Sequence, residues 1–95
     1  MNAEEFIRSL ADDQPPKEIS VLLQSLWYDA KGDWERSHHL ISDIDTKDAA
    51  LIHAYLHRKE GDMWNADYWY KRAVAKRPDM TIEKEWEELV VRFIA

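Results

Sequence analysis

Histidine and carboxylate side chains gather in one stretch near the middle of the chain, HAYLHRKEGDMWNADYWYKRA, residues 53–73. His53 and His57 stand four residues apart, and Glu60 follows three residues later. Residues three and four apart share one face of a helix, so this trio could ligate a metal ion. However, the Glu that follows the first His in H-E-x-x-H metalloenzymes is missing here. The main expectation is two histidines packed against a neighbouring helix, with metal binding as an alternative hypothesis.

A second histidine pair, His38-His39, lies earlier in the chain and could supply a further ligand. If two helices pack side by side there, His38 could approach His53 or His57, whereas helical projection turns His39 toward solvent. A four-histidine cluster would titrate at about pH 6–7 and could act as a pH-sensitive seam. The favoured interpretation is nevertheless a coincidence of histidines on an exposed face. The alternative function is therefore a metal- or small-ligand-binding protein, such as a hydrolase, that uses His38, His53, His57 and Glu60.

The aromatic residues that follow divide between two helix faces. Trp69 and Tyr70 share a face with small residues and are expected in the core. Trp64 and Tyr68 lie one turn apart on the opposite face, with Lys71 and Arg72 nearby. They either lie beneath a helix formed by residues 81–95 or stand exposed as an interface patch, because Trp and Tyr commonly anchor protein interfaces.

Catalysis has little support in the sequence. No Ser, Cys or Lys stands in a recognisable nucleophile motif, and no glycine-rich phosphate loop is present. Four glutamates near the end of the chain, interleaved with Lys84 and Arg92, are expected to form a solvated face: Glu83, Glu85, Glu87 and Glu88. We expect a non-enzymatic protein with no catalytic residue and no cofactor.

Composition limits the class of protein further. A chain of 95 residues is expected to form a single domain, residues 1–95. Its formal charge of −6 disfavours nucleic acid and anionic membranes as partners. It has no Cys, which excludes disulfides and cysteine-ligated zinc. With no secretory signal and no apolar run long enough to span a bilayer, we expect a cytoplasmic location.

Two Gly-Asp pairs, Gly32-Asp33 and Gly61-Asp62, each end one helical pattern and begin another. Glycine adopts the left-handed conformation that follows a helix, and Asp is a favoured helix N-cap. Each pair is therefore predicted to be the turn of a helical hairpin.

Hydrophobic residues at three- and four-residue steps predict an all-α fold of six helices without strands. The second helix is expected to begin at Pro15-Pro16, and the fifth to continue to Pro78 with Val74 on its packed face. Asn2, Thr46 and Thr81 are predicted N-caps. The predicted organisation is an N-terminal capping helix in 1–14, hairpins in 15–46 and 47–78, and a C-terminal capping helix in 79–95.

The second hairpin, residues 47–78, resembles a tetratricopeptide repeat. The resemblance rests on the Gly-Asp turn and on the spacing of small, aromatic and proline residues: Ala54, Gly61, Asp62, Ala66, Tyr70, Ala73 and Pro78. Residues 18–46 match the family more loosely, and a shift of 29 residues superimposes the two units. The resemblance implies stacked helical hairpins that bind other proteins.

The resemblance also implies a concave groove lined by the first helix of each unit. The expected lining residues are Leu22, Leu26, Asp29, Leu51, Tyr55 and Arg58. An apolar strip with charged edges suits a short peptide or an amphipathic helix. Alternatively, a terminal helix or a second copy of the chain fills the groove. We therefore expect a small protein-interaction module that binds in this groove or self-associates through its aromatic patch, with a structural homodimer subunit as a further alternative.

Overall fold

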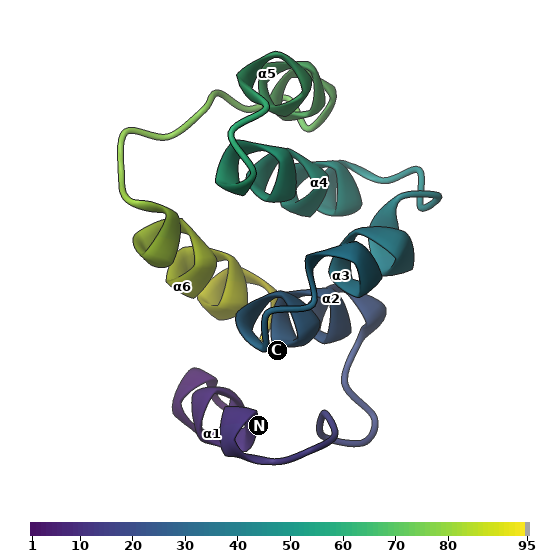
Figure 1. Cartoon of the computed structure of the whole chain (residues 1–95), viewed down its shortest axis with the longest axis vertical. Helices are drawn as coiled ribbons and strands as arrows, with labels where there is room; N and C mark the ends of the chain where they lie inside the picture. Colours follow the sequence, from purple (N-terminus) through teal and green to yellow (C-terminus); the bar gives the residue numbers. More distant parts are fainter. Residues whose placement is uncertain (95) are drawn as a thin grey trace.

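The computed structural model describes residues 1–94, which form six α-helices and one short 3₁₀ segment. They are α1 (Ala3–Arg8), η1 (Ser9–Ala11), α2 (Val21–Ala30), α3 (Trp34–Ile41), α4 (Lys47–Lys59), α5 (Met63–Arg72) and α6 (Ile82–Phe93). No strand occurs in this range, so the predicted all-α class is confirmed (Figure 1). None of the helices in residues 1–94 is long and apolar enough to cross a membrane.

The two Gly-Asp turns are as predicted. Gly32 and Gly61 follow α2 and α4 with φ of +88° and +87°, in the left-handed region that favours glycine. Asp33 and Asp62 cap α3 and α5, each accepting a hydrogen bond from the backbone N–H three residues ahead. The turns bring α2 against α3 and α4 against α5 as two helical hairpins.

The predicted N-caps Asn2, Thr46 and Thr81 are confirmed, but the predicted start of the second helix is wrong. That helix begins after Ser20, whose hydroxyl accepts a hydrogen bond from the third helical N–H. Glu18 has a left-handed φ of 68°, which no residue inside an α-helix can adopt. The two prolines therefore lie in the non-helical connection between η1 and α2 and not in the first turn of α2.

The fifth helix is also shorter than predicted, because α5 ends at Arg72. Val74 adopts a φ of +56° and points outward, so its predicted place on the packed face is wrong. The Ala75 N–H donates to the Tyr70 carbonyl at 2.9 Å, which closes a Schellman motif. Ala75 packs on the apolar cluster that includes Tyr70, the contact that usually accompanies this motif. This contact favours ending the helix at the Schellman motif over continuing it to Pro78.

Replacing Val74 by Gly should raise the free energy of unfolding by about 0.5–1 kcal/mol. A β-branched residue is strained at positive φ by about 1–2 kcal/mol, part of which the greater entropy of glycine in the unfolded chain offsets. Urea denaturation measures the change. The matched reverse variant, Gly61→Val, should destabilise the folded protein through backbone strain at positive φ. An added Cβ meets nothing within 4 Å there, so a steric clash does not contribute. A Val74→Gly protein less stable than the parent would contradict the strain.

Small residues lie where the helices of each hairpin cross. The Ser25 and Ser37 hydroxyls lie 2.9 Å apart between α2 and α3, and each donates to the other's backbone carbonyl. Ala54 and Ala66 are fully buried between α4 and α5. These short side chains allow the helix backbones to approach closely.

The last helix, α6, lies across the first helices of both hairpins, α2 and α4 (Figure 1). Trp86 of α6 donates its indole N–H to the Leu26 carbonyl at 3.0 Å. Its ring also packs on Phe6 of α1, with centroids 6.2 Å apart. The main core therefore contains side chains of α1, α2, α4 and α6, with Ile41 contributed by α3.

Candidate functional site

Helix α6 covers most of the predicted groove. Leu26, Asp29 and Tyr55 are buried, and Leu22, Leu51 and Arg58 are half-buried. Leu51 borders a surface pocket between α4 and α6, and Asp29 and Tyr55 border a smaller one, so the six residues do not line one continuous open groove. Of the two alternatives, a groove filled by a terminal helix is the one observed.

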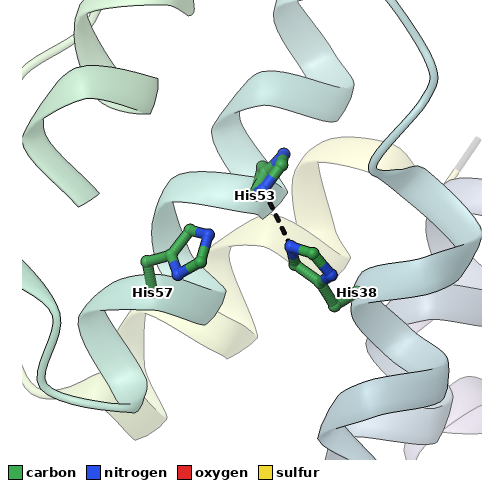
Figure 2. Close-up of side chains that lie close together, drawn as sticks. All are labelled: His38, His53 and His57. Carbon is green, nitrogen blue, oxygen red and sulfur yellow. Dashed lines mark hydrogen bonds between the residues drawn. The ribbon is translucent and has the colours of Figure 1, made fainter. Parts of the chain in front are cut away.

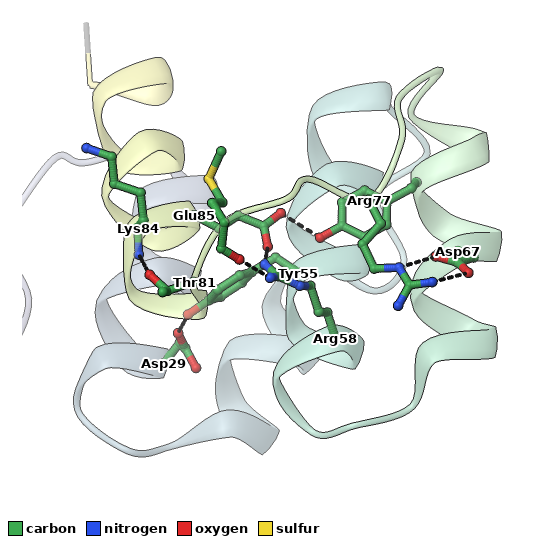
Figure 3. Close-up of polar contacts among 10 residues, drawn as sticks. Asp29, Tyr55, Arg58, Asp67, Arg77, Thr81, Lys84 and Glu85 are labelled. Atoms are coloured by element: carbon green, nitrogen blue, oxygen red, sulfur yellow. Dashed lines mark hydrogen bonds and ion pairs between the residues drawn. The ribbon is translucent and has the colours of Figure 1, made fainter.

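A buried ion pair holds α6 in place, and it includes a glutamate expected to face solvent. Glu85 is only 4% exposed. Its carboxylate accepts hydrogen bonds of 2.6 Å from the Arg58 guanidinium and from the Tyr70 hydroxyl. Arg58 also donates to the Met80 carbonyl, just before α6 begins (Figure 3). The prediction of a solvated face is wrong for Glu85, because this side of α6 faces α4, where the Arg58 guanidinium pairs with it.

A second buried carboxylate lies between α2 and α4. The Tyr55 hydroxyl donates to Asp29 Oδ2 at 2.5 Å, and the Lys59 ammonium donates to Oδ1 at 2.8 Å. Burial raises the pKa of the Tyr55 hydroxyl and the neighbouring Asp29 carboxylate raises it further, so the hydroxyl remains a donor. Asp29 and Tyr55 thus join the two hairpins beneath α6.

Three histidines from two helices converge where α3 meets α4. One ring nitrogen from each of His38, His53 and His57 lies within 4.8 Å of the other two. The Nε2 atoms of His38 and His53 are 2.9 Å apart and share a hydrogen bond (Figure 2). His53 is buried, while His38 and His57 are half-buried at the edge of the seam. The approach of His38 to the α4 pair, which the sequence offered only as the less favoured interpretation, is therefore observed. We call these three residues the histidine cluster.

Tryptophan rings hold the histidine cluster on two sides. The Trp69 ring stacks on His53 with centroids 3.9 Å apart, and the Trp34 ring stacks on His38 at 4.9 Å. The expectation that the cluster titrates near neutral pH is wrong for His53, since burial, with His38 and His57 nearby, lowers its pKa to about 3. Burial also lowers the pKa of His38. These two imidazoles are therefore neutral at pH 7.

Glu60, the fourth predicted ligand, lies outside the histidine cluster. The Glu60 Oε2 atom is 3.3 Å from His57 Nδ1, so the carboxylate binds the outer side of that ring. Glu60 groups with His57 and Asp62, apart from His38 and His53. His39 is exposed, as expected from helical projection. Glu60 is therefore a partner of one histidine and does not contact the others.

The predicted aromatic patch is exposed on the outer face of α5. Trp64 is 77% exposed and Tyr68 is 45% exposed, so no part of residues 81–94 covers them. Their rings stack with centroids 6.3 Å apart. Arg72, one turn further on, donates to the Tyr68 hydroxyl at 3.1 Å and lies 5.9 Å from the centre of its ring. We call Trp64, Tyr68 and Arg72 the α5 stripe.

Sequence reasoning missed Glu85 and placed Arg72 only near Trp64 and Tyr68, and the available signal differs between these two residues. Arg72 follows Tyr68 by four residues, as Tyr68 follows Trp64, so the spacing alone predicts that the three side chains share one helix face. For Glu85 there was no local signal, because its partner Arg58 lies on another helix.

Comparison of the chain with protein-family models finds no match, and comparisons with curated proteins and with solved structures find none either.

Proposed function

We propose that this chain is a small, non-enzymatic protein-interaction module whose contact surface is the α5 stripe. The observation that carries the proposal is an exposed, stacked Trp64–Tyr68 pair with Arg72 in line. Trp, Tyr and Arg are the three residue types most enriched among those that dominate binding energy at protein interfaces. Exposed apolar patches on soluble proteins mark such contact sites.

The α5 stripe is also ordered before any partner arrives. Ring stacking fixes Trp64 against Tyr68, and the hydrogen bond from Arg72 fixes the tyrosine hydroxyl. Arg72 itself is oriented by Asp45, 3.4 Å away at the end of the first hairpin. Immobilising such side chains during binding costs about 0.5–1.5 kcal/mol each, so a stripe that is already ordered binds with a smaller entropic penalty.

The proposal includes a tetratricopeptide-like relationship for residues 18–78. Support comes from the two Gly-Asp turns with left-handed glycines and from the small residues at both helix crossings. Because α6 fills the side on which a groove was expected, the exposed outer face of α5 is the surface proposed for partners. The acidic composition and lack of cysteine support a cytoplasmic place of action.

Self-association is the first form of this function to test, by sedimentation velocity from micromolar to millimolar concentration. We expect a reversible dimer that Trp64→Ser weakens at least about 30-fold, the effect of losing an interface residue worth 2 kcal/mol. Val91→Ser is the matched control, because Val91 is also an exposed apolar residue but lies on α6. Its dimer should remain as tight as that of the parent chain.

A parent chain that is monomeric at every concentration would remove self-association and require a different protein as the partner. In that case, immobilised parent and Val91→Ser chains should retain the same proteins from a cell extract, and Trp64→Ser should lose them. If all three chains retain identical proteins, the α5 stripe is not a contact surface and the proposed function is wrong.

A further inference from the structure

We propose that His38, His53 and His57 form a binding site for one divalent transition-metal ion of the zinc class. The site lies between α3 of the first hairpin and α4 of the second, and the Trp69 ring separates it from Tyr68 and Arg72 of the α5 stripe. It goes beyond the proposed interaction function, because none of its three ligands belongs to that stripe.

The spacing of the three rings is close to that of a metal site. Zinc–nitrogen bonds of about 2.0–2.1 Å in tetrahedral geometry place two ligand nitrogens about 3.4 Å apart. The His38 and His53 Nε2 atoms are already 2.9 Å apart, and a nitrogen of His57 lies within 4.8 Å of both rings. His57 is half-buried and no tryptophan stacks flat on it, so rotation of its ring would bring its lone pair toward the point that faces the other two nitrogens.

The surroundings of His57 provide an outer partner of the kind that metal-binding histidines have. Glu60 Oε2 lies 3.3 Å from His57 Nδ1, so an Nδ1–H donated to this carboxylate leaves the Nε2 lone pair for the ion. A carboxylate on the outer nitrogen orients the ring and increases its basicity. The group that sequence spacing suggested as a direct ligand thus has the role of an orienting group.

The other two rings are held in place and need not lose a net proton to bind. Trp69 stacks on His53 and Trp34 stacks on His38, so their positions are fixed before an ion arrives. In the hydrogen-bonded pair one Nε2 carries a proton; when that proton moves to the Nδ1 atom of the same ring, both Nε2 lone pairs face the ion. Both imidazoles are neutral at pH 7, the form that binds metals.

The donor set determines the class of ion. Three imidazole nitrogens suit Zn²⁺, Cu²⁺ or Ni²⁺, whereas Mg²⁺ and Ca²⁺ require oxygen ligands. His38 and His57 are half-buried, so the ion can enter from solvent and keep a fourth, exchangeable ligand. Because the ligands come from α3 and α4, a bound ion would cross-link the two hairpins and resist their separation.

Isothermal titration calorimetry, in which zinc chloride is added to chelator-treated protein, tests the site. The parent chain should bind one Zn²⁺, and His39→Ala should bind equally, because it removes an exposed histidine from the same helix. His38→Ala and His57→Ala should each weaken binding more than tenfold. Both residues are half-buried and not central to the core, and circular dichroism of each variant confirms that its helices are intact.

Thermal unfolding gives a second measurement that needs no activity. At a free zinc concentration about one hundred times Kd, the parent midpoint should rise by roughly 10 °C or more. Folded His38→Ala and His57→Ala chains should show little shift. The proposal is overturned if the parent chain binds no zinc at a concentration of about 100 µM. It is also overturned if all four chains bind zinc about equally, or if His39→Ala loses binding.

Discussion

Replacing Glu85 by Ala should lower the free energy of unfolding by about 3–5 kcal/mol, the range for removing one partner of a buried ion pair. Glu85 and Arg58 have side chains only 5% and 11% exposed. The substitution leaves the guanidinium buried without its counter-ion and deprives the Tyr70 hydroxyl of its acceptor. Because whole domains are stable by only about 5–15 kcal/mol, much of the molecule's stability depends on this carboxylate.

Urea denaturation of Glu85→Ala beside Glu88→Ala measures this effect. Glu88 lies on the same helix and is exposed, so its replacement should change stability by less than about 0.5 kcal/mol. The double variant Arg58→Met/Glu85→Leu should be less destabilised than Glu85→Ala, since no unpaired charge then remains buried. Equal stability of the two single variants would show that Glu85 does not hold α6 in place.

Metal-free protein should lose about 2 kcal/mol of stability through His53 alone as the pH falls from 6.5 to 5. The His53 pKa is about 3 in the folded chain and about 6.5 when unfolded, so the unfolded state binds more protons between these values. Stability is therefore greatest above pH 6.5 and falls by about 1.4 kcal/mol per pH unit below it. The lowered pKa of His38 acts in the same direction.

The measurement is the midpoint of urea unfolding between pH 7.5 and 5 in the presence of a chelator, above the range where most carboxylates titrate. His53→Phe keeps an aromatic ring against Trp69 and removes the titrating group, so its stability should depend much less on pH. His39→Ala should keep the full dependence of the parent. His38 and His57 are the titratable groups that face His53. If the stability of the parent chain depends on pH as little as that of His53→Phe, His53 is not held neutral by burial.

Features set by neighbouring residues were predictable from the sequence. The turns at Gly32 and Gly61, the Asp33 and Asp62 caps and the caps at Asn2, Thr46 and Thr81 all depend on chemistry within four residues. These local signals were sufficient for the all-α class. Placing two predicted helices side by side made a meeting of His38 with His53 possible, but it did not favour that meeting over a chance exposed pair.

Features that depend on contacts between distant segments were not predictable in this way. Glu85 is a typical exposed residue by type, and only the approach of α4 places Arg58 beside it. Whether α6 fills the groove depends on the relative fit of Trp86 and an external ligand, which no pattern within either helix specifies. Val74 violates its own conformational preference because packing of Ala75 outweighs it. In each case, tertiary packing overrides the intrinsic tendency of the residue.

The contact between Trp86 and Leu26 has a consequence for the order in which the molecule folds. Sixty positions separate these residues, whereas each hairpin closes within about a dozen residues. Closing a long loop has a larger entropic cost, so we expect both hairpins to form before Trp86 reaches the first hairpin. The contact of Glu85 with Tyr70 spans only 15 residues, so α6 can meet the second hairpin much earlier. The slowest step of refolding is thus expected to be the packing of Trp86 against Leu26, which joins the two hairpins through α6.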